Sequence, residues 1–323
     1  MSQAPMGFKI SPVLQEHMCR LGSKLPFDES SGELTKLLRV ETNAKQIERL
    51  CHCYGEKLDE IDWEEAYSDA VQMKINYDKG SEVYCMADGS MLLTREEKWK
   101  EIKLGRIFSG GSNIGHISKD RGVVSESVYS AHLGNAADFW ERFSKEIPHQ
   151  RNLVFIADGA KWIWNHVEAC YPGSTQILDY FHCKEHVSDF AKDYFGKDSN
   201  VCTQFVEQVM VCFSNKKVEQ GLKKIEALEL SRKRLEKHRE KLIGYLNANR
   251  KRIDYGTFKE KGYLVGSGAI EAAHRDVIQK RLKLSGQWWT MKGAQQIENL
   301  RVCEKSNQWN RLINLIINEN IAA

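Results

Sequence analysis

The sequence contains no long apolar run, which argues against helices that cross a membrane. No stretch of the 323 residues approaches the roughly 20 apolar residues that span a bilayer. The opening residues, MSQAPMGFKISP, also lack the apolar core of a secretory signal. We therefore expect a cytoplasmic protein with no membrane partner.

Cysteine pairs of the zinc-binding kind are also missing. The chain has nine cysteines, but no C-x-x-C pair, and only Cys51 and Cys53 lie close together. A zinc ribbon therefore has no ligand set here. We expect the scattered cysteines to be small buried hydrophobic residues.

The chain carries little net charge, only +3, which points to no particular partner. The distribution of the charge is more informative, because Lys216 to Arg252 holds thirteen Lys and Arg against five Glu. A solvated helical face and a phosphate-binding surface explain this segment equally well.

The N-terminal region has the pattern of a small helical domain. Ser11 is placed to cap a helix through Leu21, a second helix is expected over about Ser30–Leu38, and Thr42 or Asn43 would cap a third. The third helix should bury one face, formed by Ile47, Leu50 and Cys51. A short helix, a tight turn and a longer helix outline a helix-turn-helix, although any small helical bundle shares that outline.

Three strand-like stretches follow: SEVYCMADGSMLLT, WKEIKLGRIFSG and VVSESVYSAHLG. Their alternation predicts an antiparallel meander. We then expect a helix at about 136–145, a strand at 152–157, a helix at 160–169, a strand at 175–182 and a helix from Cys183. Strands that alternate with helices are typically parallel.

Residues 200 to 252 read as charged helices, and further helices close the chain. The expected fold is therefore α/β, with a ribonuclease H-like mixed sheet, a helical insertion and an N-terminal helix-turn-helix-like region. We expect four segments, which are a DNA-binding region at 1–75, a first core part at 76–199, a basic insertion at 200–260 and C-terminal core helices at 261–323.

Two carboxylates stand at comparable places in this order. Asp88 is expected near the end of the first strand and Asp158 at the end of the fourth, each followed by a glycine. If these strands are neighbours, the carboxylates meet and repel unless a hard cation such as Mg²⁺ or Mn²⁺ lies between them. Asp158 by itself is more typical of a helix cap, and Gly159 would leave the space above it open.

A third acid is expected from a late helix, and Glu271 in GSGAIEAAHR is the best candidate. Gly266 and Gly268 would let the backbone approach closely, and Arg275 lies one turn further on, within reach of Glu271. Three acids can hold two ions about 4 Å apart, an arrangement that activates an attacking oxygen in phosphoryl transfer.

The motifs ADGAKWIW, ILDYFHCKEH and GSGAIEAAHRDVIQKRLKLSGQWW resemble insertion-sequence transposases of the Kra type, which are bacterial relatives of the Mutator-like DDE transposases. LGSKLPFDESSGELTKLL resembles their N-terminal region, so the resemblance covers roughly residues 18 to 305. It implies a ribonuclease H-like fold and transposition by cutting and joining double-stranded DNA at terminal inverted repeats. It also implies a nucleoid-associated homodimer or larger assembly.

The same resemblance implies that Asp88, Asp158 and Glu271 are the catalytic, metal-binding triad, with a pair of Mg²⁺ or Mn²⁺ ions as cofactor. It places Asp179 and His182 in a motif after the second acid, and we expect them, with Arg275, beside the metal site. The family's upstream cysteine pairs are missing here, and SGQWW replaces the expected SGMRW.

Residues expected to contact DNA come from the N-terminal helices and from the late basic segment. They are Lys45, Arg49, Lys280, Arg281, Lys283 and Trp289. Trp289 is the aromatic residue chosen for base contact, although core packing is the more usual role of a tryptophan.

Three other functions compete with transposition. HCKEH, His182 to His186, matches a zinc-protease motif, but we expect His182 to end a strand, with no third ligand following. The alternatives to transposition are an idle DNA-binding protein derived from a transposase and a ribonuclease H-like nuclease that cuts without joining.

Overall fold

The computed structural model describes residues 9–60, 81–111, 114–118, 121–148, 152–197 and 199–321. The chain forms two compact units. The first comprises Met1–Val83, Asp88–Gln150 and Ile270–Ala323, and the second comprises Tyr84–Ala87 and Arg151–Ala269. The expected boundary at 75 and 76 lies outside the described residues, and the four expected segments stay predictions.

Three helices open the first unit, as the sequence predicts: α1 (Pro12–Gly22), α2 (Phe27–Leu38) and α3 (Ala44–Glu60). Both expected caps are present, because Ser11 accepts a hydrogen bond from the amide of Leu14 and Asn43 accepts one from Gln46. The expected face of α3 is buried. Helix α2 begins three residues earlier than predicted, directly after Pro26, because proline is well suited to a helix start. A helix-turn-helix function for these helices stays a prediction.

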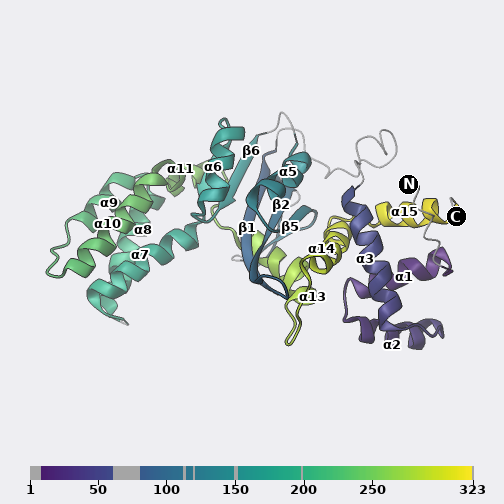
Figure 1. Ribbon diagram of the computed structural model, residues 1–323. Helices are drawn as coiled ribbons and strands as arrows, with labels where there is room; N and C mark the ends of the chain where they lie inside the picture. The colour runs from purple at the N-terminus through teal and green to yellow at the C-terminus, as the bar shows by residue number, and fades with distance from the viewer. Residues whose placement is uncertain are drawn as a thin grey trace. The chain divides into compact units, whose positions relative to one another are not determined.

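A mixed five-stranded sheet follows, with the strand order β5-β2-β1-β6-β7 (Figure 1). Its strands are β1 (Val83–Thr94), β2 (Lys98–Ser109), β5 (Val128–Leu133), β6 (Leu153–Ala157) and β7 (Thr175–Leu178). β2 pairs with β5 antiparallel and β6 pairs with β7 parallel, as predicted. The expected neighbour relation between the first strand and the strand before Asp158 is present, since β1 lies beside β6.

Two predictions about the first three strands were wrong. The expected third strand is interrupted after Val124, and its first part, β4 (Arg121–Val124), pairs with β3 (Ile114–Ser118) in a separate hairpin. The weak alternation of this stretch did not reveal the break. In addition, Asp88 lies in the middle of β1 rather than near its end, because the strand continues to Thr94, where Leu92 and Thr94 are buried.

In the first unit, α5 (Ala136–Glu146) packs on β2 and β5 through stacked aromatic rings. Phe139 and Phe143 have ring centroids 5.3 Å apart, and the Phe143 ring fills the space beside Gly105, where a Cβ would lie 2.4 Å from it. Only glycine leaves room for that ring in β2.

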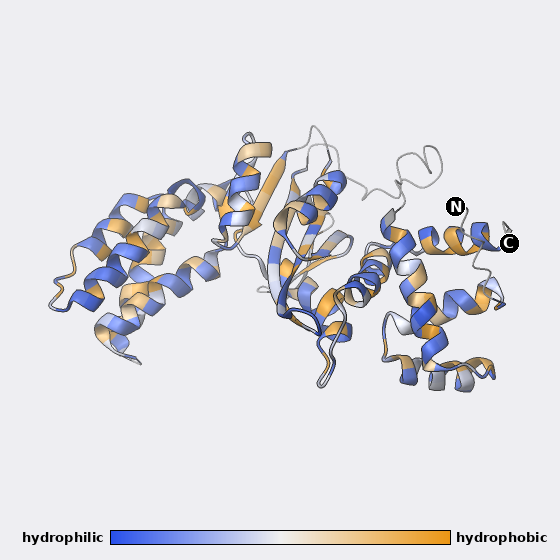
Figure 2. Cartoon of the chain, viewed as in Figure 1, coloured by the Kyte–Doolittle hydropathy of each residue, from blue (hydrophilic) through white to orange (hydrophobic). Residues whose placement is uncertain are grey.

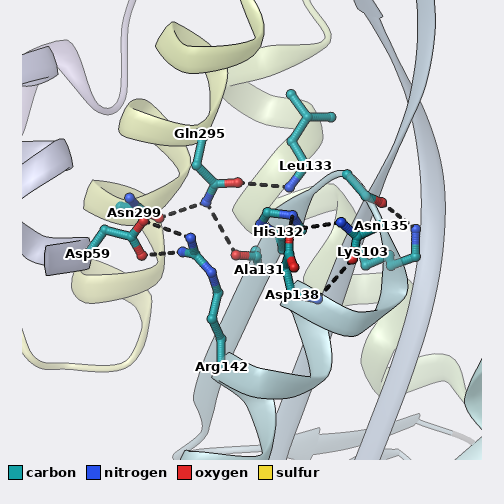
Figure 3. A network of polar contacts seen from close by, with 11 residues as sticks. Asp59, Lys103, Ala131, His132, Leu133, Asn135, Asp138, Arg142, Gln295 and Asn299 are labelled. Atoms are coloured by element: carbon teal, nitrogen blue, oxygen red, sulfur yellow. Dashed lines mark hydrogen bonds and ion pairs between the residues drawn. The ribbon is translucent and has the colours of Figure 1, made fainter. Parts of the chain in front are cut away.

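A polar network in the first unit ties α3, α5 and β5 to helix α14 (Met291–Lys305) (Figure 3). Gln295 accepts a hydrogen bond of 2.8 Å from the amide of Leu133 and donates to the carbonyl oxygen of Ala131. Arg142 donates to Asp59 with an N–O distance of 2.7 Å. These bonds satisfy groups at the edge of the sheet and fix α14 against it.

The second unit is built on β6 and β7, and the residues of β6 are strongly apolar (Figure 2). Its helices are α6 (Lys161–Cys170), α7 (Tyr180–Phe195), α8 (Asn200–Ser214), α9 (Val218–Glu226), α10 (Lys233–Ala248) and α11 (Tyr255–Glu260). A 3₁₀ turn, Arg250–Arg252, follows α10. The predicted helical character of residues 200 to 252 is confirmed.

The strand expected at 175–182 was too long. β7 ends at Leu178, because Asp179 accepts a hydrogen bond from the amide of His182 and so begins α7 at Tyr180. His182 therefore lies in the first turn of a helix and does not end a strand.

The late segment forms α12 (Gly268–Ala273), a π-helical turn (His274–Gln279), α13 (Lys280–Leu282), α14 and α15 (Trp309–Ile321).

Within the described ranges, no helix has both the length and the apolar character needed to cross a membrane.

Candidate active-site residues

Asp88 lies in β1 with a partly buried carboxylate. Its Oδ1 accepts a hydrogen bond of 2.7 Å from the amide of Gly89. Its Oδ2 lies 3.4 Å from Nε2 of His274, and the Asp88 side chain is 32% exposed. The carboxylate is thus held in place but still reachable from solvent.

His274 is the neighbour of Asp88 that sequence reasoning missed. It is almost fully buried, and its Nδ1 lies 3.1 Å from the hydroxyl oxygen of Ser90. Burial lowers the pKa of His274 to about 4, while the Asp88 carbonyl opposes this shift. The imidazole is therefore neutral at pH 7 and adds no positive charge beside Asp88, and its Nε2 has no hydrogen-bond partner among the described residues. In the sequence, the only indication that His274 lies near the candidate site is its position three residues after Glu271.

Glu271 belongs to the same unit as Asp88 and is exposed on α12. Arg275 is also exposed, but the chain changes from α-helix to a π-helical turn at His274, between the two residues. The predicted pair between Glu271 and Arg275 stays a prediction. Turns of π-helix inside helices occur frequently at functional sites.

Asp158 follows directly after β6 in the second unit. Its Oδ1 accepts a hydrogen bond of 2.9 Å from the amide of Ala160, two residues on, and its carbonyl oxygen accepts one of 2.6 Å from the Trp164 indole. The N-cap position of α6 is held by Ala160, which offers no side-chain cap. Asp158 therefore closes an Asx-type turn and is not the helix cap that its position suggests.

The space beside Gly159 is filled rather than open, contrary to the sequence-based expectation. A Cβ at Gly159 would lie 2.4 Å from the Tyr245 ring, which also lies 4.2 Å from the His186 ring. Burial raises the pKa of Tyr245, with Asp158 among the lesser causes. Tyr245 thus covers the turn that holds Asp158. It lies in the helical insertion, and nothing in its local sequence indicates this contact.

Asp179 is buried and serves the backbone of the second unit. Its Oδ1 accepts a hydrogen bond of 2.6 Å from the amide of His182, and its Oδ2 accepts one of 2.6 Å from Ser267. The hydrogen bond between Asp179 and His182 thus comes from the main chain of His182 and not from its imidazole. Gly266 packs beside this carboxylate and the Phe181 ring, whereas Gly268 faces open space.

His182 and His186 face each other on one side of α7, with Nε2 atoms 3.2 Å apart. Their position on a single helix removes one argument raised against the zinc-protease motif. However, among the described residues no group of three or more His, Cys, Asp or Glu is arranged to hold a metal ion. The two imidazoles contact each other, which accounts for their placement without a metal ion. Burial is the main cause that lowers the pKa of His186, and the His182 charge lowers it further.

The expected DNA-contacting residues differ strongly in exposure. Arg49 is exposed, and Lys45 and Lys280 are exposed but paired with Glu48 and Asp276. Burial lowers the pKa of Lys283, and the Asp88 charge opposes this shift. Arg281 and Trp289 are buried, and the neighbouring Trp288 is 59% exposed.

The three candidate carboxylates offer the oxygen atoms that a hard cation prefers, although the described residues contain no group of three or more His, Cys, Asp or Glu already arranged to hold a metal ion. Each offers oxygen ligands, and no described residue donates a hydrogen bond to Oδ2 of Asp158. Asp88 and Glu271 belong to the first unit and Asp158 to the second. This chemistry is compatible with Mg²⁺ or Mn²⁺ and does not favour zinc.

The sequence was also compared with known proteins. No model of a protein family matches the chain, and no curated protein matches it.

Proposed function

We propose that the chain is a metal-dependent DNA transposase of the DDE type. One observation carries the proposal. The strand that contains Asp88, β1, is the sheet neighbour of β6, the strand that Asp158 follows. The motifs that resemble Kra-type transposases support the same reading, and they supply Glu271 as the third acid.

In this proposal Asp88, Asp158 and Glu271 are the metal ligands. When bound, two Mg²⁺ or Mn²⁺ ions supply an activated oxygen nucleophile and stabilise the leaving oxygen of an in-line displacement. The hydrogen bond from Ala160 fixes one oxygen of Asp158 and leaves the other available. His274 lies beside Asp88 without adding charge, so the negative potential that attracts the ions is kept.

The reaction has two steps with the same chemistry. Water breaks a phosphodiester bond at the element end and leaves a free 3′-OH. This hydroxyl then attacks a phosphodiester of the target DNA and displaces its 3′ oxygen, with no covalent enzyme intermediate. The basic residues between Lys216 and Arg252 would bind DNA phosphates. Two ends must be held together, so we expect a homodimer or larger assembly.

The test is a cleavage and joining assay. The substrate is a supercoiled plasmid that carries the DNA flanking the gene, incubated with the full chain and Mg²⁺. Asp88→Asn, Asp158→Asn and Glu271→Gln should each lower cleavage by about 100-fold or more, because each removes a metal ligand worth several kcal/mol in the transition state. Asp189→Asn, which alters an exposed acid on α7, is the matched control.

The outcomes separate the competing functions. Full Mg²⁺-dependent cleavage by Asp88→Asn or Glu271→Gln would contradict the triad. Cleavage without joined products would identify a nuclease, and DNA binding with no cleavage would identify an idle relative of a transposase.

A further inference from the structure

A second candidate site lies entirely in the first unit, in a pocket of about 480 Å³. Its walls come from the start of α2, the start of α3 and the segment from Gln287 to Gly293. This volume falls within the range of about 300–1,000 Å³ typical of small-ligand sites. Three of the residues expected to contact DNA line it, namely Lys45, Arg281 and Trp289.

Arg281 is the central feature of the pocket. Its side chain is only 1% exposed, and its guanidinium lies 4.8 Å from the Phe27 ring and 4.9 Å from the Trp289 ring. Its Nε donates a hydrogen bond of 2.9 Å to the carbonyl of Gly22. Nη1 and Nη2, however, have no hydrogen-bond partner among the described residues.

A buried charge without a partner is costly, and a guanidinium with two free donors is suited to a phosphate. Burial is the main cause that lowers the pKa of Arg281 to about 10, and the Glu29 charge is among the lesser effects that oppose the shift. The unmet donors therefore favour an anionic ligand at this pocket.

Two further unsatisfied atoms belong to residues that line the same pocket. Nε2 of His52 and Oε1 of Gln287 are buried and have no hydrogen-bond partner in the described part of the chain. Burial lowers the pKa of His52, which favours the neutral imidazole. The pocket thus offers an acceptor and a neutral imidazole in addition to the guanidinium donors, a combination that matches the polar edge of a nucleobase.

Aromatic surface is available at the same place. Trp288 lines the pocket and is 59% exposed, and its carbonyl is fixed by a hydrogen bond of 3.3 Å from Arg95. An exposed indole is a stacking platform for an unpaired base. Two acids, Asp28 and Glu48, also line the pocket. Their negative charge is offset, because Lys45 pairs with Glu48 at 2.7 Å and Arg95 lines the pocket as a further positive charge.

We propose that this pocket binds one unstacked nucleotide, with its phosphate on Arg281 and its base against Trp288. The nucleotide is either part of a DNA strand or a free mononucleotide. The first of these two sources rests on the proposed function. An unpaired nucleotide held in this way would keep a DNA end in register while the strand is processed.

The test measures binding in EDTA, where no cleavage occurs. Fluorescence anisotropy of a 5′-fluorescein 20-mer is followed for the full chain with three probes: the single strand, its perfect duplex, and a duplex with one unpaired nucleotide. Trp288→Ala should weaken binding of the single strand and of the bulged duplex by about 10-fold, since stacking contributes about 1–3 kcal/mol per base. Trp99→Ala, at another exposed tryptophan, is the matched control and should leave both affinities unchanged.

Arg281→Met keeps an unbranched apolar stem, is shorter and removes the charge, and it should weaken binding of the same two probes. Because Arg281 is buried, the affinity of Arg281→Met is interpreted only if its circular dichroism spectrum matches that of the wild type. If the spectra differ, the affinities of Trp288→Ala test the proposal. Competition by dAMP would identify free nucleotide as a ligand, and its failure, with the strand effects retained, would identify the DNA strand. The proposal is overturned if Trp288→Ala binds every probe as Trp99→Ala does. Binding is measured in EDTA, where the triad cannot act, so failure of the triad in the cleavage assay and failure of this pocket in the binding assay are distinguishable.

Discussion

Asp179 illustrates at the residue scale how a motif residue can have a structural role. Its two carboxylate oxygens accept hydrogen bonds from the main chain of His182 and Ser267, and its side chain is buried. It joins the start of α7 to the loop before α12. The residue thus fixes the local fold of the second unit whether or not it affects catalysis.

We predict that Asp179→Ala lowers the free energy of unfolding by about 2–4 kcal/mol, because two buried amides lose their acceptors. Urea denaturation followed by circular dichroism measures this change. Asp189→Ala, at an exposed position on the same helix, should change stability by less than about 0.5 kcal/mol. Equal effects of the two substitutions would refute the role assigned to Asp179.

Glu298 on α14 makes a prediction about pH. It is fully buried, and neither carboxylate oxygen has a hydrogen-bond partner in the described ranges. Burial raises its pKa to about 8, although the Arg301 charge opposes the shift. The unfolded chain releases this proton near pH 4.5, whereas the folded state keeps it up to about pH 8. The contribution of Glu298 to the free energy of unfolding is therefore full below pH 4.5 and is lost as the pH rises toward 8.

Glu298→Gln removes that titration and keeps the shape of the side chain. The free energy of unfolding of the wild type, obtained from urea denaturation, should fall between about pH 5.5 and pH 8 more steeply than that of the variant, by up to about 1.4 kcal/mol per pH unit. Parallel curves for the two proteins would show that Glu298 is not held protonated.

At the scale of elements, the turn between β6 and α6 depends on helix α10. Gly159 leaves room for the Tyr245 ring, which would lie 2.4 Å from an added Cβ. We predict that Gly159→Ala destabilises the protein by about 1–3 kcal/mol, because the ring must move.

The substitution should cost much less in a Tyr245→Ala background, so a double-mutant cycle measured by urea denaturation should show a coupling of about 1 kcal/mol or more. Additive effects would mean that the ring does not press on this turn.

The order of helices and strands could be predicted because it depends on local periodicity and caps. Asn43 and Ser11 are examples, since each cap acts on an amide three residues away. The break after Val124 and the end of β7 at Leu178 were missed because weak alternation does not define strand ends.

Contacts between distant parts of the chain could not be predicted in this way. His274 and Ser90 are 184 residues apart in sequence yet lie 3.1 Å from each other beside Asp88. The unmet donors of Arg281 are equally invisible in the sequence, because burial and hydrogen bonding depend on the folded chain.

At the scale of the whole molecule, the proposed ligands come from both compact units. Asp88 and Glu271 belong to the first and Asp158 to the second. The central claim is that these three carboxylates bind the same metal ions, and this claim can be tested without knowing the DNA sequence that the protein recognises.

The most direct measurement is a Mn²⁺ titration of the full chain, with free Mn²⁺ detected by electron paramagnetic resonance. Mn²⁺ is suitable because it prefers carboxylate oxygens. The wild type should bind about two ions, and Asp88→Asn, Asp158→Asn and Glu271→Gln should each lose at least one of them, whereas Asp189→Asn should not. Identical Mn²⁺ binding by the wild type and all three variants would contradict the proposed metal site.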